Sequence, residues 1–292
     1  MDTIIALQRL ASPALDRAML LITDICSQEA FTVLLVLAFL AVDATFGRRL
    51  GIVFLAGAYV NDAIKTLVDA PRPFQVRPEV LRGSAADTAP GSSFPSGHAQ
   101  SALTFWTLSA LRFKRAWFWA LAVLIIAAVA LSRVYLGVHY PADVLGGLGV
   151  GLLVVIVAQF AGRLSFAPGK AVVVTLGLLV PLVVHLVFTT EASHVFLAVA
   201  SAFIVGPELV SHRASGGVVT RLAMGVVGVA LVAAVLSATS ALMPEEVKHA
   251  PLPGYLRYLA IGFTGTVLAP LVCRWARLSG GAVVATGSAK RA

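Results

Sequence analysis

Long runs of apolar residues, separated by short polar segments, dominate the pattern along this 292-residue chain. A helix needs about 20 apolar residues to cross the ~30 Å hydrocarbon core of a bilayer. Nine runs approach that length, and in lipid they must be helical because nothing else there satisfies the backbone. These predicted spans lie near residues 30–46, 50–69, 98–112, 114–135, 141–162, 170–190, 192–210, 217–243 and 254–277.

Residues 3–25 have a different pattern. Their apolar positions are interrupted by Gln8, Arg9, Pro13, Asp16 and Arg17. This mixture is typical of interfacial or re-entrant helices, so we expect a helix pair that lies at the membrane surface and does not span it. The predicted fold is therefore all-α: a polytopic membrane bundle of about nine transmembrane helices, preceded by an N-terminal interfacial helix.

Composition excludes two other classes of protein. The chain is 59% hydrophobic and 12% charged, whereas soluble domains carry about 25% charged residues. A soluble enzyme would lack the polar surface to cover itself, and a disordered chain would need low hydrophobicity. Cys26 and Cys273 are too far apart in the chain to suggest a metal site or a disulfide framework.

The net charge of +8 first suggests nucleic acid, but its distribution favours a different explanation. More than half of the 22 basic residues fall in alternate loops and the C-terminus, and this predicts that side to be cytoplasmic. They are Arg48, Arg49, Arg112, Lys114, Arg115, Arg163, Lys170, Arg213, Arg221, Arg274, Arg277, Lys290 and Arg291. We therefore expect no nucleic-acid partner. We expect the protein to lie in a plasma membrane, specifically the inner membrane of a bacterium.

Three polar runs on the predicted outward side are not explained by membrane insertion: Lys65-x6-Arg72-Pro73, Pro95-Ser96-Gly97-His98 and Ser132-Arg133-x5-His139-x3-Asp143. Lys65, Arg72 and Arg133 offer three cations, and the arginine fork matches phosphate oxygens. Ser96 and Gly97 precede a helix, where a hydroxyl and free backbone N–H groups form an anion site. The ligand predicted from these residues is a phosphate.

Two histidines in these runs add chemistry to binding. His139 and Asp143 are four residues apart at the start of a helix and share a face, so the carboxylate can orient the imidazole as a nucleophile or base. His98 can protonate a leaving oxygen. The runs contain no carboxylate cluster of the kind a two-metal phosphatase needs, so we expect phosphoryl transfer without a metal or cofactor.

Taken together, the three runs resemble the three-part signature of the type 2 phosphatidic acid phosphatase superfamily. The resemblance covers about residues 1–165, with no departure at a signature position. It implies a helical membrane enzyme that dephosphorylates lipid phosphates, prenyl diphosphates or sugar phosphates. The nine-span layout is also similar to that of glucose-6-phosphatase, in topology only.

The resemblance also implies a role for each signature residue. His139 would form a phosphohistidine, Asp143 would orient it, and His98 would act first as general acid and then as the base that activates water. The phosphoryl oxygens would be bound by Lys65, Arg72, Ser96, Gly97 and Arg133. Asn61 and Asp62 lie about one turn before Lys65 and are expected to support it.

The expected organisation is a catalytic core at 1–165, additional transmembrane helices at 166–278 and a disordered cytoplasmic tail at 279–292. The expected function is hydrolysis of a lipid or polyprenyl phosphate or diphosphate at the outer leaflet. Membrane lipids are the expected surroundings, and the sequence indicates no oligomeric state. Three alternatives stay open: a phosphatase for a small soluble ester such as a sugar phosphate, a lipid phosphotransferase, and a transporter that only binds headgroups.

Overall fold

The computed structural model describes residues 1–163 and 168–279, and the secondary structure in these ranges is helical. The predicted tail at 279–292 falls, apart from its first residue, outside the described residues. The first part of the chain forms α1 (Asp2–Gln8), α2 (Pro13–Asp24), α3 (Gln28–Leu37), η1 (Ala38–Val42), α4 (Ala44–Val68), α5 (Pro73–Val76), η2 (Pro78–Val80), η3 (Ala85–Thr88), α6 (Gly97–Phe113), α7 (Ala116–Tyr135) and α8 (Pro141–Ala161). The remainder forms α9 (Lys170–Val187), α10 (Ser193–Leu209), α11 (Val218–Leu242), α12 (Glu245–His249), α13 (Pro251–Phe263), η4 (Thr264–Leu268) and α14 (Ala269–Trp275).

The helical membrane bundle predicted from the sequence is confirmed, but a count of nine spans is not. In the described ranges, six helical stretches are long and apolar enough to cross a membrane, or seven if the bent pair formed by α2 and α3 with η1 is one span. α6 and α10 each have 17 residues and fall just short of that length. The predicted run at 30–46 is interrupted after η1. Asp43 has extended backbone there, and its side chain accepts a hydrogen bond from the Phe46 N–H at 2.7 Å.

The N-terminal segment forms two helices, α1 and α2, as the interrupted pattern predicts. Pro13, which breaks the apolar run, is the first residue of α2, and Ser12 caps the helix by accepting a hydrogen bond from Leu15 N–H. A proline suits this position because the first helical N–H has no partner within the helix. The position of this helix pair at the membrane surface stays a prediction.

The chain divides into two compact units. The first contains Met1–Thr32, Val53–Phe166 and Thr190–Ser193, and the second contains Val33–Ile52, Ala167–Thr189 and His194–Ala292. The catalytic core expected at 1–165 and the helices expected at 166–278 stay predictions. The first unit also contains Thr190–Ser193, which follow α9 in the chain and lie beyond the expected boundary at 165.

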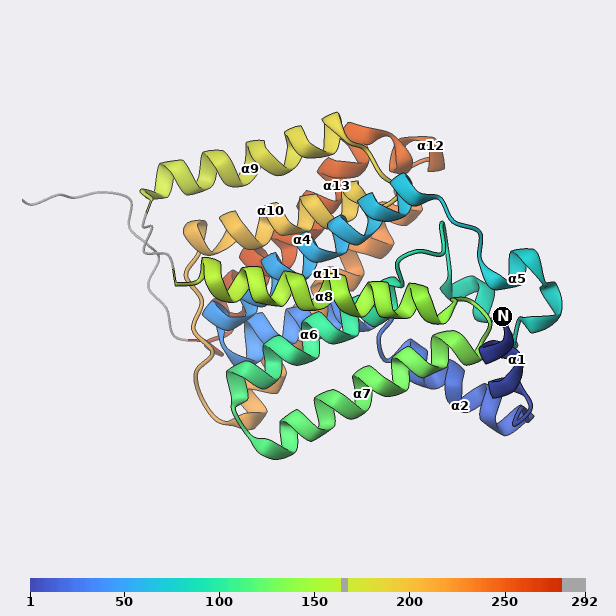
Figure 1. The fold of residues 1–292 in the computed structure, drawn as a ribbon. Coiled ribbons are helices and arrows are strands. Elements are labelled where there is room, and N and C mark those ends of the chain that lie inside the picture. The colour runs from blue at the N-terminus through green and yellow to red at the C-terminus, as the bar shows by residue number, and fades with distance from the viewer. Residues whose placement is uncertain (164–167, 280–292) are drawn as a thin grey trace, which may run out of the picture. The chain divides into compact units, whose positions relative to one another are not determined.

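Within the first unit, α6 lies beside both α7 and α8, while α1 and α2 pack against α7 (Figure 1). Glycines of α8 make the close approach to α6 possible. A Cβ at Gly147 would lie 2.3 Å from the backbone oxygen of Ser96, and one at Gly151 would lie 3.0 Å from that of Gln100. α8 therefore presses directly on the backbone that carries the second polar run.

The second unit is built around α11, which packs against η1, α13, η4 and α14. Its polar side chains find partners inside the unit. His185 stacks on Tyr255 with ring centroids 5.4 Å apart, and Ser201 and Tyr255 share a hydrogen bond of 2.8 Å. This pairing lets polar side chains exist within apolar helices at little cost.

Candidate active site

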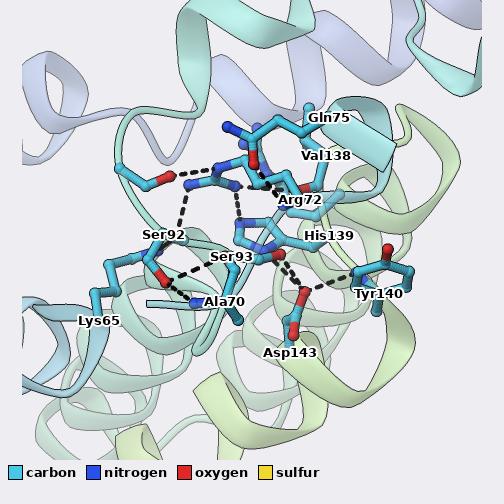
Figure 2. A network of polar contacts seen from close by, with 12 residues as sticks. Lys65, Ala70, Arg72, Gln75, Ser92, Ser93, Val138, His139, Tyr140 and Asp143 are labelled. Atoms are coloured by element: carbon cyan, nitrogen blue, oxygen red, sulfur yellow. Dashed lines mark hydrogen bonds and ion pairs between the residues drawn. The ribbon is translucent and has the colours of Figure 1, made fainter. Parts of the chain in front are cut away.

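The first and third polar runs come together in the first unit (Figure 2). The second run joins them where the N–H of Ser96 donates to the carbonyl of Asp143 at 2.9 Å. Their members are buried although they are charged: Arg72, Arg133, His139 and Asp143 are each at most 5% exposed. Buried charges are expensive unless they are paired, so their partners indicate what each group does.

Local sequence explains the position of Arg72. It stands between Pro71 and Pro73, and a residue before proline is restricted to extended backbone, which Arg72 adopts. Pro73 then begins α5, and the side chain of Gln75 accepts a hydrogen bond from the Arg72 N–H at 2.7 Å. The backbone is thereby held on both sides, and the guanidinium is directed into the unit.

The guanidinium of Arg72 uses all of its donors. Five bonds are formed, to the backbone oxygens of Pro90, Gly91, Ser92 and Val138 at 2.6–3.0 Å and to Nε2 of His139 at 3.1 Å. An arginine carries five N–H groups and accepts no hydrogen bond. Nε2 of His139 is therefore the acceptor, and its lone pair receives this bond, while the ring proton is on Nδ1.

The spacing of the third run follows from the way α7 ends. Gly137 has φ +75, and a Cβ there would lie 2.1 Å from the Val80 carbonyl oxygen, so only glycine fits the turn. After the turn, the N–H of His139 donates to the carbonyl of Arg133 at 3.2 Å. Arg133 and His139 are thus fixed relative to each other by the helix end.

Asp143 has a capping role in addition to its place beside His139. Its Oδ2 accepts hydrogen bonds from the Tyr140 N–H at 2.8 Å and from the Ser93 hydroxyl at 2.5 Å (Figure 2). The same oxygen lies 3.5 Å from Nδ1 of His139, which is longer than a hydrogen bond. Asp143 therefore begins α8 and places a negative charge next to the protonated ring nitrogen.

His139 is neutral near pH 7. Burial, followed by the charges of Arg72, Arg133 and Lys65, lowers its pKa well below the ordinary value of 6.5. A neutral imidazole with an accessible lone pair on Nε2 is the form that attacks an electrophile.

Arg133 is held by hydroxyl groups and not by a carboxylate in hydrogen-bonding contact. Nη1 donates to Oγ1 of Thr23 at 2.6 Å and to Oγ1 of Thr88 at 2.9 Å, and Nη2 donates to the Thr88 carbonyl at 3.0 Å. Neutral partners leave the positive charge uncompensated at short range. α2, which carries Thr23, thereby takes part in the candidate site.

Lys65 and His98 complete the cluster. The ammonium of Lys65 donates to the backbone carbonyl of Ser92, in the loop that Arg72 also binds. His98 lies in the first turn of α6, where Arg133, His139, Arg72 and Lys65 all act on it electrostatically. The same three cations, Arg72, Arg133 and Lys65, therefore act on both His98 and His139.

Several buried polar atoms of these residues have no hydrogen-bond partner within the described ranges. They are Nδ2 of Asn61, Oγ of Ser96, Nε of Arg133 and Nδ1 of His139. Gly97 lies next to Asn61, since a Cβ on it would be 3.4 Å from Oδ1 of Asn61. Unpaired buried donors beside uncompensated cations are what a site for an oxyanion requires.

Asp62 supports the cluster from α4. Its Oδ2 accepts hydrogen bonds from Oγ1 of Thr190 at 2.5 Å and from the backbone N–H of Ala192 at 2.8 Å. Asp62 is thus tied to a distant turn, and it also acts electrostatically on Lys65.

Sequence reasoning missed the hydroxyl groups that hold the charged residues: Thr23, Thr88, Ser93 and Thr190. Serines and threonines are common in loops, and nothing in their spacing distinguishes these. Ser93 has the best sequence signal, because it lies two residues before the Pro95 that opens the second run.

Two family models match the chain. Residues 46–166 match the PAP2 superfamily, and residues 190–281 match the PAP2 superfamily phosphatase transmembrane extension. The chain belongs to the PAP2 superfamily. It is an integral membrane protein of that superfamily, as the predicted resemblance to type 2 phosphatidic acid phosphatases implied.

Individual relatives match parts of the chain. A decaprenylphosphoryl-5-phosphoribose phosphatase of Mycobacterium tuberculosis is 39% identical over 115 residues, which is 39% of this chain and 63% of that protein. An undecaprenyl-diphosphatase of Bacillus subtilis is 35% identical over 105 residues, 36% of this chain and 51% of that protein. The matched region therefore spans less than two thirds of these relatives. A crystal structure of a phosphatidylglycerolphosphate phosphatase from Bacillus subtilis aligns with a TM-score of 0.45 at 25% identity, covering 56% of this chain and 85% of that one.

Proposed function

We propose that this protein is a membrane phosphatase that hydrolyses a lipid or polyprenyl phosphate or diphosphate through a phosphohistidine. The observation that carries the proposal is the geometry at His139: its Nε2 accepts a hydrogen bond from the Arg72 guanidinium at 3.1 Å, and Asp143 lies 3.5 Å from its Nδ1. Membership of the PAP2 superfamily and the phosphatase names of the relatives support the same reaction class.

In the first step, Nε2 of His139 attacks phosphorus and the P–O bond to the lipid breaks. The leaving oxygen takes a proton from His98, which the negative charge of the bound phosphoryl group keeps protonated against burial and the neighbouring cations, and the phosphoryl group stays on His139 as a phosphoramidate. Arg72, Arg133, Lys65 and the Ser96–Gly97 end of α6 bind the equatorial oxygens, where charge develops.

In the second step, water attacks the phosphohistidine. His98, now without its proton, accepts one from that water as the P–N bond breaks, and inorganic phosphate leaves. The imidazole returns to its neutral form and His98 to its protonated form. The charge of Asp143 stabilises the cationic imidazole of the intermediate. No step in this scheme uses a metal, so hydrolysis is expected to continue in excess chelator.

The location of the site is part of the proposal. The basic loops predict that the ends of the spans near Lys65 and His139 face outward, away from the cytoplasm, with the C-terminus inside. Cys26 and Cys273 are buried, so single cysteines at exposed positions can be labelled selectively. A membrane-impermeant maleimide should label Glu79→Cys in intact cells and Arg115→Cys only after lysis.

Phosphate release is the direct test of function. Purified protein is assayed with phosphatidate, phosphatidylglycerophosphate, undecaprenyl diphosphate, a sphingoid phosphate and glucose 6-phosphate. His139→Ala should abolish release while the protein elutes as a folded species. Release by this variant would refute the mechanism, and a preference for glucose 6-phosphate would refute the lipid substrate. Transfer of phosphate to an added lipid would indicate a phosphotransferase.

A further inference from the structure

The turn between α9 and α10 places a carboxylate beside the candidate phosphate site. A Cβ on Gly91 would lie 2.5 Å from Oε2 of Glu191, so the glutamate side chain packs directly on the Gly91 backbone. The carbonyl of this same Gly91 accepts the hydrogen bond from Nε of Arg72 at 2.9 Å. Glu191 is therefore separated from the Arg72 guanidinium by one residue of loop backbone.

The turn holds Glu191 firmly in this position. The residues on both sides of it donate to Asp62, through the hydroxyl of Thr190 and the N–H of Ala192. Ser193 closes the turn, since its Oγ accepts from the Thr190 N–H at 3.0 Å and donates to the Thr190 carbonyl at 3.1 Å. Thr190 and Ser193 are both buried. The position of the carboxylate is thus set by its neighbours and not by its own contacts.

The charge of Glu191 reaches the cations of the site. It acts electrostatically on both Lys65 and Arg72, in company with Asp143. Asp143 is buried and hydrogen-bonded by Ser93 and Tyr140, whereas Glu191 is solvent-exposed. Glu191 is thus the carboxylate at the open side of this group.

Glu191 lies on the exposed side of the buried cations. Arg72 and His139 are buried, while Gly91 and Glu191 are exposed, so a phosphoryl group seated at His139 leaves its ester on the exposed side. In a phosphate monoester of a lipid, the atoms next to the reacting phosphate are neutral. In a diphosphate, the neighbouring group is a second phosphate, whose negative charge would lie near that of Glu191.

We propose that Glu191 is a selectivity residue that disfavours diphosphates, so that the substrate class of this site is a phosphate monoester of a membrane lipid. This inference rests on the proposed phosphatase function and narrows it. Selectivity by repulsion of the wrong partner is a common device, and like charges at a rim change relative rates even when they contribute little to binding.

The test compares two substrates that share one tail, undecaprenyl phosphate and undecaprenyl diphosphate, by phosphate release in the same detergent. Glu191→Gln should raise kcat/KM for the diphosphate relative to the monophosphate by about three- to tenfold, as expected for a partly screened charge. Glu191→Asp keeps the charge and should keep the wild-type ratio. Glu246→Gln, which removes an exposed carboxylate on α12, is the matched control and should also keep it.

Ionic strength gives an independent measurement. The screening length falls from about 30 Å at 0.01 M salt to about 3 Å at 1 M. Salt should therefore narrow the difference between wild type and Glu191→Gln in the ratio of diphosphate to monophosphate activity. Equal ratios in wild type and Glu191→Gln at low salt would overturn the selectivity role. Absence of phosphate release from both substrates by the wild type would instead overturn the proposed function.

Discussion

Nη1 of Arg72 donates a hydrogen bond to Nε2 of His139 at 3.1 Å. The electron pair that accepts this bond is the one that the proposed mechanism uses to attack phosphorus. A phosphoryl oxygen that binds Arg72 replaces the imidazole as the acceptor, so binding of substrate and release of the nucleophile are one event.

Arg72→Lys tests this relationship. A lysine keeps the charge but cannot form five bonds from a planar fork, so the loop at 90–92 and His139 would both lose their partner. We expect phosphate release to fall by about 10²-fold or more, in the range for loss of a preorganised donor. Arg77→Lys, at an exposed position after α5, is the control and should retain activity. Near-normal turnover by Arg72→Lys would show that charge alone suffices.

The depressed pKa of His139 predicts a pH dependence of stability. Below about pH 6.5 an unfolded chain protonates this histidine while the folded chain does not, so folding loses stability as the pH falls. The slope is at most about 1.4 kcal/mol per pH unit for one group. His139→Asn removes the group, so its thermal unfolding temperature in detergent should fall less than that of the wild type between pH 7.5 and pH 5. Parallel curves for the two proteins would contradict a neutral, buried His139.

Ser93→Ala removes the hydroxyl that donates to Asp143 at 2.5 Å. The carboxylate then keeps only the Tyr140 N–H and can rotate away from the imidazole. We expect kcat to fall about tenfold with KM little changed, because the orientation of the nucleophile is affected and the cations are not. The matched control is Ser84→Ala, whose hydroxyl is exposed and makes no cap bond. A rise in KM without loss of kcat would place Ser93 in substrate binding instead.

His98→Ala separates the two proposed steps. With a lipid phosphate the variant should be inactive, because the alkoxide leaving group needs a proton. An aryl phosphate such as p-nitrophenyl phosphate leaves without one, so the first step should proceed and the phosphohistidine should accumulate when its hydrolysis loses the base. An alkaline quench followed by detection of phosphohistidine measures this. Rapid, repeated turnover of the aryl ester would exclude His98 as the base.

Gly147→Ala tests the contact between α8 and the second run. The added Cβ would meet the Ser96 backbone oxygen at 2.3 Å, and neither backbone can move without shifting Ser96 or Asp143. We expect a loss of stability of about 1–3 kcal/mol and a loss of activity. Gly149→Ala is the control, because nothing lies within 4 Å of its Cβ position and alanine favours a helix.

Much of this architecture could be predicted from the sequence, and the exceptions have physical causes. Apolar runs predicted the helices because lipid leaves the backbone no other choice. The count of nine spans is not confirmed, because η1 interrupts the first run and α6 has only 17 residues. The three polar runs do meet, and two of their spacings follow from helix ends: Gly137 ties Arg133 to His139, and Asp143 caps α8 beside His139.

The partners of the charged residues could not be predicted. Arg72 is bound by carbonyl groups that every residue possesses, so its contacts leave no trace in the sequence. Thr23 and Thr88 reach Arg133 across 110 and 45 residues, and no periodic pattern links them. Such contacts depend on how the loops pack over the helix ends, and that packing depends on the tertiary structure of the whole first unit.

The two bonds that Asp62 accepts from Thr190 and Ala192 determine how far this chain can be shortened. A protein truncated after α8 would retain all three polar runs and would look, in sequence, like a complete enzyme. It would nevertheless bury the carboxylate of Asp62 without its donors, one turn from Lys65. The first unit is therefore not contiguous in the sequence, and a fragment that keeps both donors must extend through α9 to residue 193.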